Sequence, residues 1–287
     1  MSLAINNHKE APLNAHYPDI SYLSQLAFRA GALMRRNLRA GMPYEVKGDG
    51  SPVTETDNAI NRIVLESVSR DFPHIRVIAE EGCYEVEGAE YTLLSDPLDG
   101  TIPFRHGLPI STFVAALLRG TTPLLAVIYD PFMERMWSAT AGGGTFLNGA
   151  ATRHRKRVRV NDRNTLRGAS VAVFGWKSDP FNMNAARGKL EDAGAIVGNP
   201  QSVAILGGLL ASGVYDAIVF PGRHGWETAA MHLIAEEAGG KVTDIHGGTM
   251  CYGPNCEING HIITNGRIHD EIVQIVASCQ RVEVSGN

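Results

Sequence analysis

The sequence predicts a layered α/β fold in two halves that differ in rhythm. Residues 19–160 show helical periodicity twice and then short apolar runs separated by turn signals, which is typical of an α+β half with a mostly antiparallel sheet. Residues 161–287 alternate apolar runs with helical patterns, which favours an α/β half. Residues 1–18 are polar and predict a flexible lead-in.

Two helices are predicted at the start of the first half. Between Ile20 and Asn37 apolar side chains recur at the spacing of one helical face, and Asp19 can cap that helix. Thr54 can cap a second helix with one apolar face, and Pro73 follows its end.

A series of strands is predicted next. They lie at Ile75–Ala79, Tyr91–Leu94, Thr112–Leu118, Leu124–Tyr129 and Arg135–Ala139. The glycines at 142–144 and the Asn148-Gly149 pair are turn signals of a hairpin region. The basic run Arg153–Arg159 fits either an anion-binding patch or an edge strand protected by charge, and we favour the edge strand.

The second half predicts alternating strands and helices. Strands are expected at Val171–Phe174, Tyr215–Phe220 and His261–Thr264, and helices at Phe181–Ala193, Ser202–Ser212, Trp226–Ala238 and Ile268–Cys279. This order is typical of a layered α/β arrangement.

The composition excludes several classes of protein. A net charge of -4 over 287 residues argues against nucleic acid as the main partner. No apolar run reaches the roughly 18 residues of a membrane span, and the first residues lack the apolar core of a signal peptide. The four cysteines lack the spacing of a zinc site, so we expect reduced thiols and a cytoplasmic location.

One acidic motif predicts the chemistry. Asp96 and Asp99 follow an apolar run and precede Gly100 and Thr101. Two carboxylates this close repel each other unless a cation lies between them, and oxygen ligands favour magnesium, calcium or manganese. Backbone N–H groups at Gly100 and Thr101 can bind an anion. The motif therefore predicts a metal site for phosphate chemistry.

Further acidic residues lie at the boundaries of predicted elements. Glu80-Glu81 ends a strand, and Asp57 and Glu227 lie at helix starts. Each has an ordinary interpretation, because acids in first turns stabilise helices and paired glutamates are commonly solvated. Together these clusters can supply a site that binds two or more ions.

The motifs resemble those of the inositol monophosphatase family, within the magnesium-dependent, lithium-sensitive phosphomonoesterases. They are Lys47–Asp57, Glu80-Glu81-Gly82, Asp96–Thr101, and Trp226–Ala230 with Glu237–Gly240. The resemblance covers the chain from about Ile20 to the end. It implies the layered α-β-α-β-α sandwich of the inositol monophosphatase and fructose-1,6-bisphosphatase type, with the active site between the two halves.

The resemblance also implies roles for individual residues. Glu81, Asp96 and the Leu98 carbonyl match ligands of a first magnesium, and Asp96, Asp99 and Glu227 match ligands of a second. Glu81 would also hold a third, weaker ion, and Glu80 would support the ligands. Manganese is an alternative metal. The backbone of Gly100 and Thr101 matches a phosphate cradle, and Thr101 with Asp57 matches the pair that orients and helps deprotonate the attacking water.

Several positions depart from the family pattern. Glu227 replaces an aspartate, and Ile102-Pro103 replaces polar residues, of which Pro103 has no N–H to donate. Phe220 stands where inositol phosphatases carry an acid that binds substrate hydroxyls, and Gln201–Ala204 replaces a segment of small residues that lines the pocket. Phe220 cannot accept hydrogen bonds, so inositol 1-phosphate is not the expected preferred substrate.

Three basic residues near the predicted site have two interpretations each. Arg223 and His224, between Phe220 and Glu227, fit either readers of a second anionic or polar group or residues facing solvent. His106 fits a substrate contact or a surface residue, and we favour the surface.

The function that follows is magnesium-dependent hydrolysis of a small polyol or sugar phosphate by activated water. Alternatives are a phosphatase for histidinol phosphate, fructose 1,6-bisphosphate or a 3′-phosphoadenosine nucleotide, and a non-enzymatic regulator associated with RNA polymerase. The retained acids argue against the regulator, because buried carboxylates without a use are costly. The resemblance also implies a homodimer.

Overall fold

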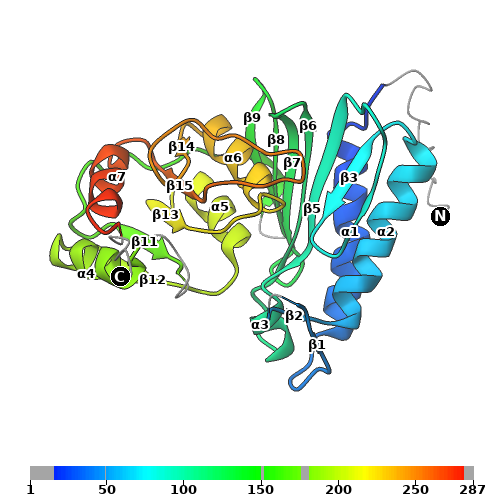
Figure 1. Ribbon diagram of the computed structural model, residues 1–287, viewed down its shortest axis with the longest axis horizontal. Coiled ribbons are helices and arrows are strands. Elements are labelled where there is room, and N and C mark those ends of the chain that lie inside the picture. Colours follow the sequence, from blue (N-terminus) through cyan, green and yellow to red (C-terminus); the bar gives the residue numbers. More distant parts are fainter. Residues whose placement is uncertain (1–15, 49, 150–151, 176–180, 281–287) are drawn as a thin grey trace, which may run out of the picture.

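The computed structural model describes residues 16–48, 50–149, 152–175 and 181–280. They form five layers, in which two sheets alternate with three layers of helices (Figure 1). The layers, in order, are α1 with α2, an eight-stranded sheet, α5 with α6, a five-stranded sheet, and α4 with α7. The predicted α-β-α-β-α sandwich is confirmed. The lead-in expected over residues 1–18 lies mostly outside the described residues.

The outer helices of the first half begin at the predicted caps. In α1 (Ile20–Asn37), the Asp19 carboxylate accepts a hydrogen bond from the Tyr22 amide. In α2 (Glu55–Asp71), Thr54 and Asp57 form a reciprocal capping box. The apolar faces of both helices are buried against the large sheet, in one core that includes Leu23, Val64 and Phe113.

The large sheet has the order β10-β9-β8-β7-β6-β5-β3-β4. Its strands are β3 (Arg76–Ala79), β4 (Gly82–Tyr84), β5 (Tyr91–Asp99), β6 (Thr112–Arg119), β7 (Thr122–Asp130), β8 (Arg135–Thr140), β9 (Gly144–Gly149) and β10 (Thr152–Arg157). All neighbours are antiparallel except β3 and β5, which are parallel. β10, which contains most of the basic run, lies at one edge of the large sheet, as the edge-strand interpretation expects.

The small sheet has the order β12-β11-β13-β15-β14. Its elements are β11 (Ser170–Val173), α4 (Met183–Asp192), β12 (Ile196–Gly198), α5 (Val203–Ala211), β13 (Ala217–Phe220), α6 (Thr228–Glu237), β14 (Lys241–Thr243), β15 (His261–Thr264) and α7 (His269–Ala277). β11 pairs in parallel with β12 and β13, whereas β15 is antiparallel to β13 and β14.

The middle helical layer joins the two sheets into one core. α5 is apolar on all sides and almost entirely buried, as expected of a helix between two sheets. Gly208 on α5 lies directly against Trp137 on β8, and a Cβ added there would come within 2.3 Å of the indole ring. The absence of a side chain at this position therefore sets how closely α5 approaches the large sheet.

Several short elements were missed by sequence periodicity. They are β1 (Glu45–Val46), β2 (Pro52–Val53), β4, β9, β12, β14 and α3 (Thr101–Arg105). Periodicity also predicts that the strand before the acidic motif ends at Leu94, and this is wrong, because β5 continues through Asp99. The motif thus belongs to the end of a strand rather than to a loop.

Candidate active site

The acidic motif lies on a bulge at the end of β5. Asp96 pairs with Val114 and Asp99 with Thr112, so three steps along β5 match two along β6. On a regular strand, residues three apart face opposite sides of the sheet. The extra residue of the bulge removes this alternation, and both aspartates line the same cavity.

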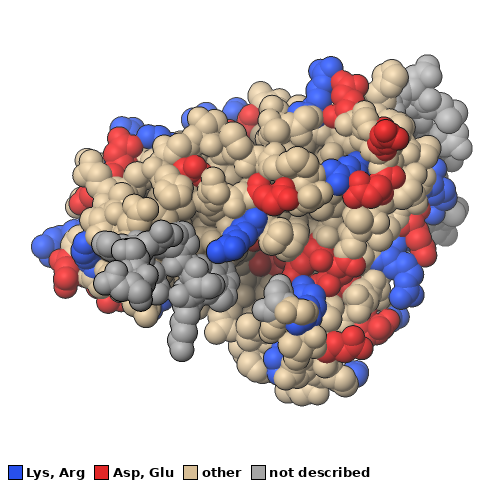
Figure 2. Space-filling view, viewed as in Figure 1, with Lys and Arg blue, Asp and Glu red and all other residues tan. Residues whose placement is uncertain are grey.

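This cavity, of about 610 Å³, lies between the two halves of the chain. Its acidic end is formed by Glu80 after β3, Asp96 and Asp99 on β5, and Glu227 before α6. Figure 2 shows acidic side chains gathered in a hollow of the visible face, with basic side chains on either side. The fold therefore brings together acids that lie up to 147 positions apart (227 − 80).

Among the described residues, Asp96, Asp99 and Glu227 form no ion pair with a lysine or arginine, whereas Glu80 pairs with Lys47. Burial, and then the repulsion of Glu80, Asp99 and Glu227, raises the pKa of Asp96 well above its usual range. Burial likewise raises the pKa of Glu227, and within the described residues its Oε2 is buried without a hydrogen-bond partner. Such an oxygen, aimed among other acids, fits a hard cation.

Lys47 supplies a positive charge to the two adjacent glutamates, Glu80 and Glu81. Its ammonium group lies 2.6 Å from Glu80 Oε1 and 2.9 Å from Glu81 Oε1. Burial opposes the charge of Lys47, but the attraction of Glu80 and its hydrogen bond outweigh burial and raise the pKa of the lysine. Among the residues that the structure describes, no three His, Cys, Asp or Glu side chains hold a ready-made metal position. The Lys47 ion pairs are one physical reason.

Glu80, and not Glu81, lines the cavity. Glu80 lies within hydrogen-bond range of Asp96, whereas Glu81 is absent from the cavity wall and contacts Lys47. The metal-ligand role expected for Glu81 stays a prediction, and the lining of the cavity favours Glu80 for that role. The two glutamates are adjacent and chemically identical, so only the strand geometry distinguishes them.

Asp99 is held by the start of α5. Its Oδ1 accepts from the Val203 amide at 3.1 Å, and its Oδ2 accepts from the Ala204 amide at 3.0 Å and from the Thr112 hydroxyl at 3.1 Å. The Ser202 hydroxyl also donates to Oδ2. Asp99 therefore accepts from the first-turn amides of a helix in the other half of the chain, whose N-cap residue is Ser202. A lone pair of Oδ1 stays available to a metal.

Thr101 and Asp57 form a hydrogen-bonded pair beside the acids. The Thr101 hydroxyl donates to Asp57 Oδ1 at 3.0 Å. Asp57 Oδ2 accepts from the Thr54 amide at 2.9 Å and from the Thr54 hydroxyl. Burial raises the pKa of Asp57, although these hydrogen bonds oppose the shift. The pair fixes the Thr101 oxygen at the mouth of the acidic cluster.

The turn between β5 and α3 depends on Gly100. This residue has φ of +88°, and a Cβ there would lie 3.1 Å from the Ser202 Cβ. The first-turn amides without intrahelical partners are those of Thr101 and Ile102, since Pro103 has no N–H. These two amides are the available donors for an anion.

The opposite end of the cavity is aromatic. The buried Phe220 ring packs edge-on against Phe174 at 5.5 Å, and Gly222 lies so close that an added Cβ would come within 2.1 Å of the ring. The His224 ring stacks on Trp226 at 4.4 Å, with the planes 4° apart. Phe220, Arg223 and His224 line the cavity, and their substrate-binding role stays a prediction. His106 is exposed and is not among its lining residues.

Residues 18–281 match the model of the inositol monophosphatase family. The chain belongs to this family. Because the chain is a member of this family, it is a phosphomonoesterase. The fructose-1,6-bisphosphatase/inositol-1-monophosphatase of Thermotoga maritima is 31% identical over 230 residues, which cover 78% of this chain and 82% of that protein.

Two other relatives are similarly close. The histidinol-phosphatase of Mycobacterium tuberculosis is 29% identical over 268 residues, covering 90% of this chain and 97% of that protein. The structure of a Thermotoga maritima IMPase superposes with a TM-score of 0.79 at 27% identity, covering 90% of this chain and 96% of that one. The family relationship thus extends over both halves of the chain.

Three contacts of this inositol monophosphatase family member were missed by sequence reasoning. They are the Lys47 bridge, the Thr112 bond to Asp99 and the Ser202 bond to Asp99. Lys47 lies in the motif Lys47–Asp57, which indicated the family but did not indicate that Lys47 contacts the glutamates. Nothing in the sequence around Thr112 or Ser202 indicated a contact with Asp99, because only the tertiary fold brings these residues together.

Proposed function

We propose that the protein hydrolyses a small phosphate monoester with the help of magnesium. The observation that supports this proposal is the gathering of Glu80, Asp96, Asp99 and Glu227 in one cavity beside the Thr101–Asp57 pair. Oxygen ligands of this kind suit magnesium, with manganese as an alternative.

The donor set fits two or three divalent ions. Asp96, the Leu98 carbonyl, Asp99 and Glu227 would be ligands, with Glu80 in the place that the family resemblance first suggested for Glu81. The buried, unpartnered Glu227 Oε2 and the raised pKa of Asp96 support this fit. When bound, such ions neutralise phosphate charge and lower the pKa of water. Lys47 occupies one oxygen of Glu80 and leaves the other oxygen of that carboxylate available to an ion.

The residues of the chain then position the reactants. The Thr101 hydroxyl, whose proton is directed to Asp57, can accept a hydrogen bond from water through its oxygen. As water attacks phosphorus, its proton passes to the Thr101 oxygen while the Thr101 proton passes to Asp57 Oδ1. The bond from phosphorus to the ester oxygen breaks in the same displacement, and the departing alkoxide takes a proton from solvent water to leave as the alcohol. The Thr101 and Ile102 amides hold phosphate oxygens. No phosphoenzyme is needed in this scheme, because water itself is the nucleophile.

The aromatic end of the cavity would determine which leaving groups the site accepts. A polyol such as inositol needs acceptors for its hydroxyl groups, and Phe220 provides none. A leaving group with a flat or apolar face would pack on Phe174 and Phe220, and Arg223 could bind a second polar group. Histidinol phosphate, fructose 1,6-bisphosphate and 3′-phosphoadenosine nucleotides are therefore kept as candidates beside inositol phosphates.

The test is phosphate release from a panel of these esters, with and without magnesium. Asp96→Asn is the decisive variant, because Asp96 accepts a backbone hydrogen bond from the nearby Leu98 amide, whereas Asp99 accepts from the first turn of α5 and supports that helix. Magnesium-dependent turnover that Asp96→Asn abolishes supports the proposal. Magnesium binding without turnover of any ester would contradict it and favour a regulatory protein of the RNA polymerase-associated kind.

Secondary properties follow from the family resemblance and are proposed with it. We infer a homodimer, lithium inhibition, a cytoplasmic location and no nucleic-acid partner. All four cysteines are free, in keeping with a reducing compartment. In the described part of the chain, no helix is long and apolar enough to cross a membrane. Light scattering of the purified protein tests the dimer.

A further inference from the structure

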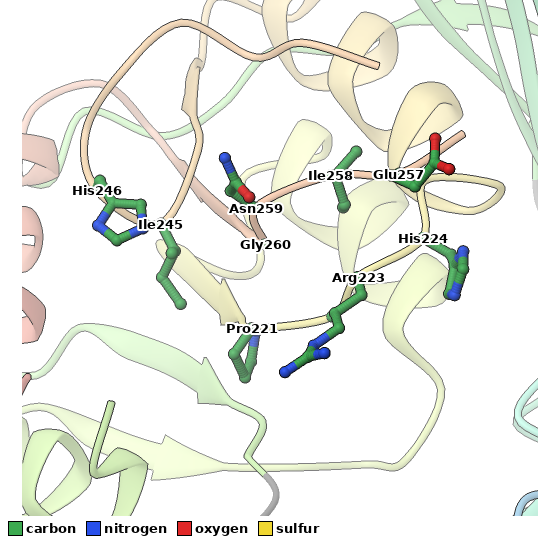
Figure 3. Close-up of a pocket in the computed structure, with 10 residues that line it drawn as sticks. Pro221, Arg223, His224, Ile245, His246, Glu257, Ile258, Asn259 and Gly260 are labelled. Atoms are coloured by element: carbon green, nitrogen blue, oxygen red, sulfur yellow. The ribbon is translucent and has the colours of Figure 1, made fainter. Parts of the chain in front are cut away.

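The loop between β13 and α6 carries Glu227 to the acidic end of the main cavity, which lies between the two halves of the chain. Figure 3 shows residues 221–224 of this loop beside residues 257–260, which lead into β15. Backbone hydrogen bonds of 2.9 Å join the two segments. They run from the amides of Gly260, Ile258 and Gly225 to the carbonyls of Gly222, Arg223 and Cys256, in that order. These bonds fix the backbone just before Glu227.

A buried side-chain contact fixes the backbone just after Glu227. Thr228 is the first residue of α6, and its Oγ1 lies 3.0 Å from Nδ1 of His261 on β15. Both side chains are fully buried. The contact forms in either tautomer of the ring, because a threonine hydroxyl can donate or accept. The start of α6 is therefore tethered to the small sheet at the residue that follows the acid.

Packing alone does not account for a histidine at position 261. The His261 ring lies 5.1 Å from the ring of Phe220, its cross-strand neighbour on β13. Burial lowers the pKa of His261 to about 3, so the ring is neutral at pH 7. Its Nε2 is buried without a hydrogen-bond partner among the described residues, which costs free energy that a phenylalanine would not lose. The contact with Thr228 is what distinguishes histidine from an apolar ring here.

The position of the Glu227 carboxylate depends on the backbone that carries it. Glu227 is one methylene longer than the aspartate of the family pattern, so its carboxylate has more rotational freedom to lose. Within the described residues no hydrogen bond holds its Oε2. A metal ligand has to stay within about 0.5 Å of its productive position. A tether on the next residue supplies that restraint.

We propose that His261 is a positioning residue for the metal site, which through the Thr228 hydroxyl holds the first turn of α6 and, with it, Glu227. The inference rests on the proposed function, because it needs Glu227 to be a metal ligand. Neither His261 nor Thr228 is among the described residues that line the main cavity. Both therefore act on the ion through the backbone of Glu227 and not by contact.

The first experiment measures magnesium binding without an ester, by calorimetry. Thr228→Val and His261→Phe each remove the contact while keeping a side chain of similar size, and each should weaken magnesium binding about threefold to tenfold. Thr228→Ser keeps the hydroxyl and should bind magnesium as the wild type does. Thermal unfolding establishes that each variant is folded.

Thr145→Val is the matched control. The Thr145 hydroxyl is also fully buried and also bonds to α6, where it donates to the Ile234 carbonyl at 2.7 Å. That bond lies toward the far end of the helix from Glu227. The control variant loses a comparable hydrogen bond and should keep the wild-type affinity for magnesium. Equal weakening in Thr145→Val and Thr228→Val would overturn the proposal, because any loosening of α6 would then be sufficient.

Double variants test the order in which the residues act. Thr228→Val combined with His261→Phe should bind magnesium no more weakly than either single variant, since the same contact is lost in all three. Thr228→Val added to Glu227→Gln should cause no further weakening, because the ligand that the tether positions is already lost. Effects that multiply in either pair would overturn the proposal.

Turnover separates positioning from a general loss of folded enzyme. With an ester that the wild type hydrolyses, the magnesium concentration for half-maximal rate should rise about threefold to tenfold in Thr228→Val and His261→Phe, whereas kcat at saturating magnesium should fall less than about twofold. A lower kcat with an unchanged half-maximal magnesium concentration would reveal a structural role alone and overturn the proposal.

Failure of this inference is distinguishable from failure of the proposed function. A wild type that binds no magnesium would contradict both. A wild type that binds magnesium and hydrolyses an ester, with single variants of wild-type affinity, would overturn the tether and leave the phosphatase proposal intact. A wild type that binds magnesium without turnover would contradict the phosphatase proposal, and weaker binding in the two single variants would still support the tether.

Discussion

At the acidic end of the main cavity three of the four acids, Glu80, Asp96 and Asp99, take part in hydrogen bonds, whereas at the aromatic end the rings pack and, among the described residues, Arg223 has no partner. Asp57 and Asp99 accept bonds from backbone amides and hydroxyls on three elements. Arg223, by contrast, is exposed and unpaired within the part of the chain that the structure describes. One end is preorganised, and the other is open to adaptation.

This difference suggests how a single fold serves several phosphate esters. In the proposed function the acidic end would bind the phosphate, which all candidate substrates share, so its geometry would have to stay constant. The aromatic end meets the leaving group, which differs between substrates. Changes such as Phe220 in place of an acid can therefore alter specificity without disturbing the hydrolytic groups.

Removing one acid should have the largest effect. Glu227→Gln keeps the shape of the side chain but removes the charge, and we expect kcat/KM to fall about 10³-fold because the proposed metal site would lose a ligand. Magnesium should also raise the melting temperature of the wild type more than that of the variant. Both effects are measured on one preparation, by phosphate release and by thermal unfolding with added magnesium.

Glu236→Gln is the matched control for this prediction. Glu236 lies on α6, nine positions along from Glu227, and pairs with His232 outside the cavity. It should keep both the activity and the response to magnesium. Equal magnesium stabilisation of the Glu227→Gln variant and the wild type would show that Glu227 is not a ligand.

Removing the Thr101 hydroxyl should have the next largest effect. Thr101→Ala deletes the group that links water to Asp57, and general-base catalysis of this kind is worth roughly 10²-fold or more. Thr101→Ser retains the hydroxyl and should retain most activity. Single-turnover phosphate release compares the two. Equal activity of the alanine and serine variants would exclude the proposed proton path.

The sequence was most informative where one local segment carries the signal. The caps Asp19 and Thr54, the helices they begin, and the order of motifs predicted the family and the fold. The Asp96–Asp99 motif also predicted an acidic site. Its bulge was not predicted, because the extra residue becomes visible only against β6. Sequence periodicity therefore ended the strand too early.

Tertiary contacts account for what could not be predicted. Glu80 and Glu81 are adjacent in sequence, and only the position of β3 beside β5 shows which one reaches the cavity. Ser202 lies 103 positions from Asp99, and nothing in either local sequence announces their hydrogen bond. The same holds for the side-chain contact between α6 and β15, which spans 33 positions.

Specificity should shift by a smaller factor when the aromatic end is changed. Phe220→Glu restores an acceptor for hydroxyl groups, so the kcat/KM for inositol 1-phosphate should rise about tenfold relative to that for a 3′-phosphoadenosine nucleotide. Gly222, which lies against the Phe220 ring, accommodates the smaller glutamate. The ratio is measured by competition of both esters in one reaction. An unchanged ratio would mean that Phe220 does not contact the leaving group.

The smallest effect on catalysis is expected away from both ends, at the buried His269. Its ring nitrogens lie 3.1 and 3.0 Å from the hydroxyls of Thr243 and Thr264, and burial lowers its pKa to about 4. At pH values between about 4 and the unfolded pKa of about 6.5, the His269 ring binds a proton in the unfolded chain but not in the folded chain. The stability present at pH 7 is therefore lost progressively as pH falls through that window.

Urea unfolding at pH 7 and pH 5 measures this loss. His269→Gln keeps hydrogen-bonding groups but does not titrate, so its stability should depend less on pH than that of the wild type, by at most about 1.4 kcal/mol per pH unit before solvent screening. His106→Gln, at an exposed position, should keep the wild-type dependence. The kcat at pH 7 should be the same in the His269→Gln variant and the wild type. A large fall in kcat would mean that the hydrogen bonds of His269 in the small sheet influence the active site. The acidic and aromatic ends of the cavity would then depend on each other through that sheet.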